Sequence, residues 1–226
     1  AQTFAKTFDD SLPVKLLFIG SQSASRPFET YGGVELLEAY AGLLRRTTQP
    51  VELVVRAAVP AEVKLRYGSL PGLTIIDEVV PWPVIEGHFK TADVAVLPYH
   101  STTPHTLLEA MSYELPVVTR GSWGNGEFVA DGETGIVVPP SPAVPYYYPG
   151  GVHPAFDSAA FQQAIATPDP QFVERLAAGM HSLVESADLR RRLGRAGRLA
   201  VEQGRFAQAR RDDALKQIFD EALGRA

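Results

Sequence analysis

The sequence predicts a three-layer, Rossmann-like α/β domain, in which a parallel sheet of about six strands lies between two layers of helices. Short apolar runs alternate with segments of helical periodicity from residue 14 to residue 138. The runs are almost entirely apolar, which is typical of strands that are buried on both faces. After residue 169 the pattern is helical alone, so we expect a helical C-terminal segment.

The composition is that of an ordinary water-soluble globular protein. The chain has 226 residues, of which 45% are hydrophobic and 21% are charged, and this length suffices for a substantial core. A net charge of -5 argues against a nucleic-acid partner, and the lack of Cys excludes disulfides and thiolate metal sites. No apolar run approaches the ~20 residues of a transmembrane segment. We therefore expect a cytoplasmic protein, either free or peripheral to the membrane.

The start of the chain is predicted to lie outside the folded domain. Residues 1–13 form a polar lead-in or linker that ends at Pro13, and residues 14–226 form the domain. The chain begins at Ala1 with neither an initiator Met nor a signal peptide. We therefore expect it to be a fragment of a longer protein.

From Val14 onward, apolar runs and helical segments follow one another. Gly20 ends the first run, and Leu36, Tyr40 and Leu43 recur at helical spacing in the segment after it. Gly, Pro and polar clusters separate the later segments. The expected order is a strand at 14–19, a helix at 34–46, a strand at 51–55, a short helix at 60–67, a strand at 73–76, a turn at 81–83 and a brief helix at 85–91.

The next segment is predicted to be strand, loop, helix and strand. The apolar run at 94–97 is expected to be a strand, which Pro98 ends, and Pro104 suits the first turn of a helix. A second strand is expected at 115–119. We expect residues 117–119 of it to pair in parallel with the strand at 94–97, both in the middle of the sheet. Because ligands bind at the carboxyl ends of strands in such sheets, the loop before Pro104 is the predicted site.

The rest of the chain contains an unusual insertion. A Gly-rich turn, one helical turn and a strand at 136–138 precede a stretch at about 140–168 that is rich in Pro, Gly and Tyr. We expect a surface loop that packs its own aromatic side chains, with a short helix at 158–165. The alternative is a contact surface for an acceptor, a partner domain or a membrane. Closing helices are expected at 171–186, 188–203 and 206–223, with the Arg side chains between 190 and 198 on a solvated face.

The stretch LPYHSTTPHTLLEAMSYELPVVT resembles the signature of retaining family 4 glycosyltransferases of the GT-B fold. That signature has an acidic residue, seven further residues, then Glu-Ala-Met and a Pro-Val-Val strand. Glu109 matches its Glu, and the turn at 131–135, with Glu127 before it, matches a second pattern of the family. The resemblance covers about residues 14–223 outside the insertion. It implies that residues 14–226 form the C-terminal, nucleotide-sugar-binding domain of such an enzyme.

The resemblance also implies where a nucleotide-sugar donor would bind. Glu109 would accept hydrogen bonds from both ribose hydroxyls. The helix start, with Thr106 and Leu107, would hold the diphosphate through backbone N–H groups and the helix dipole. Val80 and Trp82 lie where an apolar slot for the nucleobase is expected. The other candidates for donor contacts are Gly20, Ser21, Arg26, His100 and Ser101.

Three charged residues of the family pattern are replaced in this chain. Ser21 stands where an Arg follows the first strand, Gly32 where a Lys precedes the next helix, and Ser101 where an acidic residue contacts the donor sugar. Arg26, in the same loop as Ser21, is the candidate that could restore a positive charge. No catalytic residue is assigned. The scattered His residues offer no set of three ligands, so we predict no metal and no other cofactor.

Two functions are compatible with these residues. The favoured one is the donor-binding half of a hexosyltransferase, which transfers a sugar from a nucleotide sugar to a glycan, a lipid or another acceptor. Such a domain would be inactive without an N-terminal domain that binds the acceptor. The alternative is a non-catalytic, glycosyltransferase-like binding or scaffolding domain that has lost donor chemistry. The intact Glu109 favours the first function, and the three replaced charges favour the second.

Overall fold

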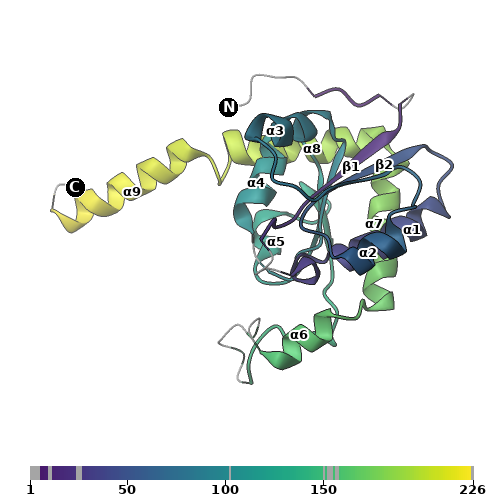
Figure 1. Cartoon of the computed structure of the whole chain (residues 1–226). Coiled ribbons are helices and arrows are strands. Elements are labelled where there is room, and N and C mark those ends of the chain that lie inside the picture. Colours follow the sequence, from purple (N-terminus) through teal and green to yellow (C-terminus); the bar gives the residue numbers. More distant parts are fainter. Residues whose placement is uncertain are drawn as a thin grey trace.

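The computed structural model describes residues 6–9, 12–23, 27–101, 103–149, 151, 155 and 158–224. In this part of the chain, six parallel strands form one sheet in the order β3-β2-β1-β4-β5-β6 (Figure 1). The predicted fold class is confirmed. The strands are β1 (Val14–Ile19), β2 (Val51–Arg56), β3 (Leu73–Ile76), β4 (Val94–Leu97), β5 (Val117–Arg120) and β6 (Gly135–Val138).

Helices cover both faces of the sheet, which gives the predicted three layers. Helices α1 and α7 pack together on one face, and α3, α4 and α8 lie on the other (Figure 1). The helical elements are η1 (Phe28–Tyr31), α1 (Gly33–Leu44), α2 (Ala61–Tyr67), α3 (Trp82–Thr91), α4 (Pro104–Ser112), α5 (Asn125–Phe128), α6 (Ala159–Ile165), α7 (Pro170–Val184), α8 (Ala187–Glu202) and α9 (Gln208–Ala222).

Strands β4 and β5 are buried along their whole length, as their apolar runs predict. All four residues of β4 are buried, and it pairs in parallel with β5, with Ala95 opposite Val117. The expected adjacency of the two strands is therefore confirmed. Both strands were expected in the middle of the sheet, but of the two only β4 lies there. Its other neighbour is β1, whereas β5 lies next to the edge strand β6. The two central strands are β1 and β4.

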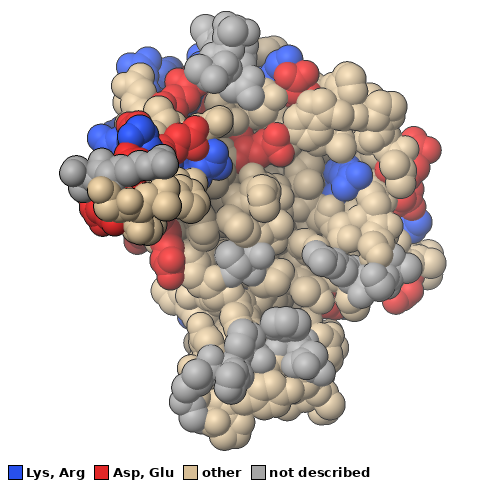
Figure 2. All heavy atoms as spheres, turned by 90° about the vertical axis from the view of Figure 1, so that its left-hand side faces the viewer, with Lys and Arg blue, Asp and Glu red and all other residues tan. Residues whose placement is uncertain are grey.

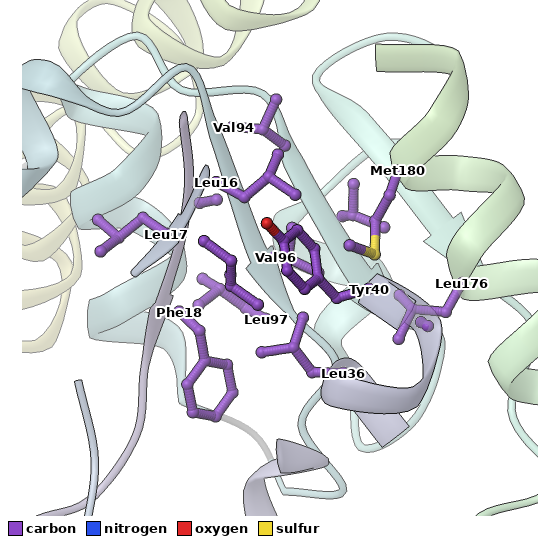
Figure 3. Packing of buried hydrophobic residues seen from close by; sticks show 14 of the residues in the cluster. Leu16, Leu17, Phe18, Leu36, Tyr40, Val94, Val96, Leu97, Leu176 and Met180 are labelled. Carbon is purple, nitrogen blue, oxygen red and sulfur yellow. The ribbon is translucent and has the colours of Figure 1, made fainter. Parts of the chain in front are cut away.

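One continuous hydrophobic core joins the sheet to its α1/α7 layer. Leu16 and Phe18 of β1 and Val96 of β4 meet Leu36 of α1 and Met180 of α7 (Figure 3). Each of these side chains is fully buried. Burial of a side chain of this size contributes roughly 1.5–3 kcal/mol, so the layers are held together mainly by the hydrophobic effect. This packing fixes where each strand ends, and hence the edge at which ligands are expected.

Two local predictions were wrong. The expected turn at 81–83 is the start of α3, with Pro81 as its N-cap and Pro83 in its first turn, where a missing N–H costs nothing. Arg190 is fully buried rather than solvated. Its guanidinium donates to the carbonyls of Leu183 and Val184, over 2.7 and 3.0 Å, and so caps the C-terminal end of α7.

The two ends of the described chain differ in how they contact the domain. In the lead-in, the ammonium of Lys6 donates to the carbonyl of Lys90 over 3.0 Å at the end of α3. The boundary between a lead-in at residues 1–13 and a domain at residues 14–226 stays a prediction. At the other end, α9 projects away from the domain and buries none of its residues (Figure 1).

Candidate functional site

The carboxyl ends of β1 and β4 form the switch point of the sheet. From this point the strand order continues through β2 to β3 on one side and through β5 to β6 on the other. Such a point is where open parallel sheets bind ligands. Gly20 follows β1 directly, and a Cβ on it would lie 2.8 Å from the Cβ of Ala57. The hydroxyl of Tyr99, a buried residue after β4, donates to the carbonyl of Ile19. The two loops are therefore held close together at a defined spacing.

Helix α4 starts at this switch point with unused hydrogen-bond donors. Pro104 occupies its first turn, and Thr103, its N-cap, makes no capping hydrogen bond through its side chain. The N–H groups of His105 and Thr106 have no acceptor within the helix because they lie in its first turn. That of Leu107 donates to the carbonyl of Thr103 over 3.3 Å, and its side chain is fully buried. The helix start can thus bind an anion through two N–H groups and the helix dipole.

Glu109 lies one turn further along α4 and is half-buried. Its carboxylate accepts no hydrogen bond and forms no ion pair with any residue that the structure describes. Burial raises the pKa of Glu109, and the neighbouring His105 opposes this only in part. A partly desolvated carboxylate without a partner is costly to the fold, and it is available to hydroxyl donors of a ligand.

The two positions where the family has cations in the first loop are unlike each other. The Ser21 hydroxyl accepts from the N–H of Ser23 over 3.0 Å, and so stabilises its own loop. Gly32 has a φ of 68°, and a Cβ there would lie 2.3 Å from the carbonyl oxygen of Pro98. A Lys at position 32 is therefore excluded by the backbone as it is folded here. The positive charge cannot be restored at that position by a simple substitution.

Arg56 is a cation at this edge that the sequence analysis overlooked. It is the last residue of β2, is half-buried, and donates through Nη1 to the carbonyl of Gly20 over 3.3 Å. Its Nε is buried without a hydrogen-bond partner in the described chain, and burial lowers the pKa of the guanidinium. The available signal was a charged residue at the carboxyl end of an apolar strand.

A second group of polar residues at the same edge is fully buried. Glu35, in the first turn of α1, accepts through Oε2 from His100 over 2.8 Å and from Arg120 over 2.5 Å. His100 follows β4, and its Nδ1 lies 3.1 Å from the hydroxyl of Tyr146. Arg120 ends β5, donates to the carbonyl of Pro98 over 3.2 Å and stacks on a core aromatic ring. We refer to Glu35, His100, Arg120 and Tyr146 as the buried network.

Protonation in the buried network follows from its hydrogen bonds. Burial raises the pKa of Glu35, but the hydrogen bond from His100 and the charge of Arg120 outweigh it, so that the pKa is lowered. Burial lowers the pKa of His100, and the ring is therefore neutral at pH 7. Since a carboxylate only accepts, Nε2 of His100 carries the proton and Nδ1 accepts from the hydroxyl of Tyr146. The predicted donor contact His100 thus has both ring nitrogens occupied within the protein.

The segment predicted to hold the nucleobase lies between β3 and α3. Trp82 is 48% exposed, and Val80 is half-buried. Val79 and Val84 are also exposed, so several apolar side chains face solvent here. The side-chain amide of Gln22, in the loop after β1, donates to the carbonyl of Ile76 over 3.2 Å and so connects the two strand ends. These contacts leave the nucleobase assignment a prediction.

The remaining predicted residues differ in what the structure says of them. Ser101 is half-buried and lies just before the start of α4. Arg26 lies outside the described residues. In the described chain, no group of three His, Cys, Asp or Glu side chains could hold a metal ion. No helix among the described residues is long and apolar enough to cross a membrane.

Comparison with known protein families and structures agrees with this arrangement. The profile of the family glycosyl transferases group 1 matches residues 13–146. No curated protein matches the chain by sequence. Among solved structures, WaaG, a glycosyltransferase involved in lipopolysaccharide biosynthesis, is 18% identical, with a TM-score of 0.62. That match covers 89% of this chain and 46% of WaaG, so the chain spans about half the length of that protein.

Two further structures show the same fold. The C-terminal domain of a glycosyl transferase group 1 family protein from Francisella tularensis is 18% identical, with a TM-score of 0.60, and the match covers 88% of this chain and 89% of that one. Alr3699/HepE from Anabaena, solved in complex with UDP and glucose, is 14% identical, with a TM-score of 0.61. The match covers 92% of this chain and 48% of HepE. The domain therefore has the fold of the C-terminal half of GT-B glycosyltransferases.

Proposed function

This chain belongs to the glycosyl transferases group 1 family, and on that premise we propose that it is the donor-binding half of a glycosyltransferase. Its ligand is a nucleotide sugar, bound at the switch point between β1 and β4. The sugar goes to a glycan or lipid acceptor, and a lipid acceptor would bring the domain to the cytoplasmic surface of a membrane. The observation that carries the proposal is the carboxylate of Glu109, half-buried, without a hydrogen-bond partner among the described residues, and one turn from the start of α4.

Different groups around Glu109 are proposed to bind the ribose, the diphosphate, the base and the sugar of the donor. The carboxylate suits the two ribose hydroxyls, because a charged acceptor can take two hydrogen bonds at once. The N–H groups of His105 and Thr106 suit the diphosphate. Trp82 offers an apolar surface for the base. Ser101, before α4, lies on the side where the sugar would follow the diphosphate.

The positive charge for the diphosphate is proposed to come from Arg56. Its Nε has no acceptor in the described chain, and its Nη1 lies against Gly20, the residue before Ser21. The end of the neighbouring strand would thus supply a cation where Ser21 and Gly32 supply none. With Arg56 and a helix start at the site, binding requires no metal ion, and chelation by EDTA should leave affinity unchanged.

The second half of the active site is proposed to belong to an N-terminal domain. Along α9, Leu215, Ile218, Phe219 and Leu223 are between 45% and 63% exposed, and their spacing places them on one side of the helix. An apolar helix face of this kind fits against another domain. Correct placement of two reactants is worth ~7 to 11 kcal/mol of a barrier, so this chain alone should not transfer sugar.

Calorimetric titration of this chain with the diphosphates of uridine, guanosine and adenosine, in EDTA, tests the proposal. At least one should bind, and more tightly than its nucleoside. The alternative, a glycosyltransferase-like scaffold without donor chemistry, is favoured by the backbone that excludes a Lys at Gly32 and by the internal bond of Ser21. If no nucleotide binds at millimolar concentration, the scaffold function replaces the donor-binding function.

A further inference from the structure

The insertion at residues 140–168, which we call the arm, forms a lobe of its own beyond the carboxyl ends of the strands. It leaves the sheet after β6, contains α6, and returns to the domain at α7 (Figure 1). Between Glu133 and Asp169 the sequence contains a single carboxylate, Asp157, and no Lys or Arg. Figure 2 shows this lobe at the bottom of the view, uncharged wherever its atoms are described.

Aromatic packing and a hydrogen bond of Tyr146 attach the described part of the arm to the domain. Val144, Tyr146, Phe161 and Ile165 form a small core of their own, against which Trp123 of the loop after β5 packs. The rings of Trp123 and Tyr146 lie edge to face with centroids 5.8 Å apart. The hydroxyl of Tyr146 binds the buried network at His100. The arm is thus held in a defined position and can form one wall of a binding site.

A cavity of about 340 Å³ lies between the arm and the domain. The arm contributes Ser141, Gln163 and Thr167 to its lining, and the domain contributes Glu35 and Asp169. Among the described residues, no Lys, Arg or His lines it. The lining thus combines two carboxylates, two hydroxyls and one side-chain amide with the apolar side chains of Ala143, Val144, Ala164 and Pro170.

One carboxylate oxygen in the cavity wall is unused. Glu35 is 4% exposed, and both of its hydrogen bonds, from His100 and Arg120, go to Oε2. Its Oε1 takes no bond from any described residue. This oxygen belongs to a side chain that is almost entirely buried, and it can accept a hydrogen bond from a group that enters the cavity. This oxygen indicates that the cavity binds a hydrogen-bond donor.

The charges around the cavity favour a neutral donor over a cation. Arg120 offsets the charge of Glu35, and Asp169 caps the positive end of α7, where it accepts from the N–H of Gln171 over 2.9 Å. The net negative charge at the cavity is therefore smaller than its two carboxylates alone would give. We propose that the cavity is a second binding site, which takes a sugar ring of a neutral glycan through its hydroxyl groups.

This site is distinct from the proposed donor site. Glu35, not Glu109, forms part of its wall, and the arm, not the start of α4, forms its outer side. The role of the glycan as acceptor rests on the proposed function. The binding of a sugar ring is argued from the cavity and its lining alone, and so it is independent of that function.

The test uses the chain as it is, with glucose, galactose, mannose and N-acetylglucosamine as probes and ethanolamine as a cationic control. Saturation-transfer NMR detects the millimolar affinities expected of a ligand this small. Gln163→Trp places a large side chain in the cavity from an exposed position of α6. Gln162→Trp is the matched control, because Gln162 is the adjacent, equally exposed residue and does not line the cavity. Circular dichroism checks that both variants are folded.

We expect at least one hexose to receive saturation from the wild type and from Gln162→Trp, and the signal to be lost in Gln163→Trp. Binding of a nucleoside diphosphate should be the same in all three proteins. No signal from any hexose, a signal that survives in Gln163→Trp, or binding of ethanolamine in place of the hexoses would overturn the proposal. Loss of nucleotide binding alone would contradict the proposed function and leave this site standing.

Discussion

Two glutamates at the same edge of the sheet have opposite surroundings. Glu35 is buried and accepts hydrogen bonds from His100 and Arg120, whereas Glu109 is half-buried and accepts none from the described residues. The pKa of Glu35 is lowered and that of Glu109 is raised. The fold uses the charge of Glu35 through Oε2, and the carboxylate of Glu109 is the one available to the nucleotide donor. For the nucleotide donor, the informative feature is therefore a partly buried carboxylate with no hydrogen-bond partner among the described residues.

The strand-end arginines repeat this contrast. Arg120, at the end of β5, is fully buried against Glu35 and stacks 3.5 Å above the ring of Phe172. Arg56, at the end of β2, is half-buried, and among the described residues it donates to a backbone carbonyl and to no carboxylate. The ion pair of Glu35 and Arg120 is therefore structural. Glu109 and Arg56, which are not paired with each other, are the two residues that we assign to the donor.

The largest effect is expected when the structural pair is broken. Glu35→Ala leaves Arg120 buried without a counter-charge and should lower the free energy of unfolding by about 3–5 kcal/mol. Glu109→Ala should change it by less than about 0.5 kcal/mol, because it removes no hydrogen bond or ion pair with a described residue. Urea unfolding of the three proteins measures both. A loss at Glu35 below about 1 kcal/mol, as at an exposed ion pair, would show that the network is not structural.

A smaller effect is expected at Arg56. Arg56→Gln should weaken nucleoside diphosphate binding about tenfold, because a charge-assisted contact is lost, and should leave the nucleoside unaffected. The difference should shrink as salt rises, since the residue is partly exposed. Arg45→Gln is the control, because Arg45 is an exposed Arg after the far end of α1. Equal losses for diphosphate and nucleoside would mean that Arg56 does not contact the phosphates.

The smallest expected effect is on the pH dependence of folding stability. The contributions of Glu35 and Glu109 to stability should change in opposite directions as pH rises. Because its folded pKa is lowered, Glu35 stabilises the fold above its unfolded pKa, and this stability is lost as pH falls through the folded pKa. Because its folded pKa is raised, Glu109 favours the fold at low pH, and this contribution is lost as pH rises through the folded pKa. Glu109→Gln should therefore gain stability relative to the wild type as pH rises. Unfolding curves across the acidic range measure the difference, and a gain as pH falls would contradict the assignment.

The sequence predicted the sheet better than the polar contacts at its edge. Apolar runs such as Val94–Leu97 identify strands because burial on both faces demands apolar residues at every position. Glu109 was found because it belongs to a local motif. The bond between Glu35 and Arg120 joins residues 85 positions apart, so no local pattern could reveal it. The role of His100 was open for the same reason, since its partners come from α1 and from the arm.

The central claim is that Glu109 binds the ribose of a nucleotide donor. Isothermal titration of the wild type, Glu109→Ala and Glu133→Ala with nucleoside diphosphates tests it most directly. Glu133→Ala is the control, because Glu133 is an exposed residue of the turn that leads into the opposite end of β6. Each charge-assisted bond contributes ~1.5 to 3 kcal/mol, so Glu109→Ala should weaken binding at least about tenfold, and Glu133→Ala should not. Equal affinity of wild type and Glu109→Ala would contradict the account.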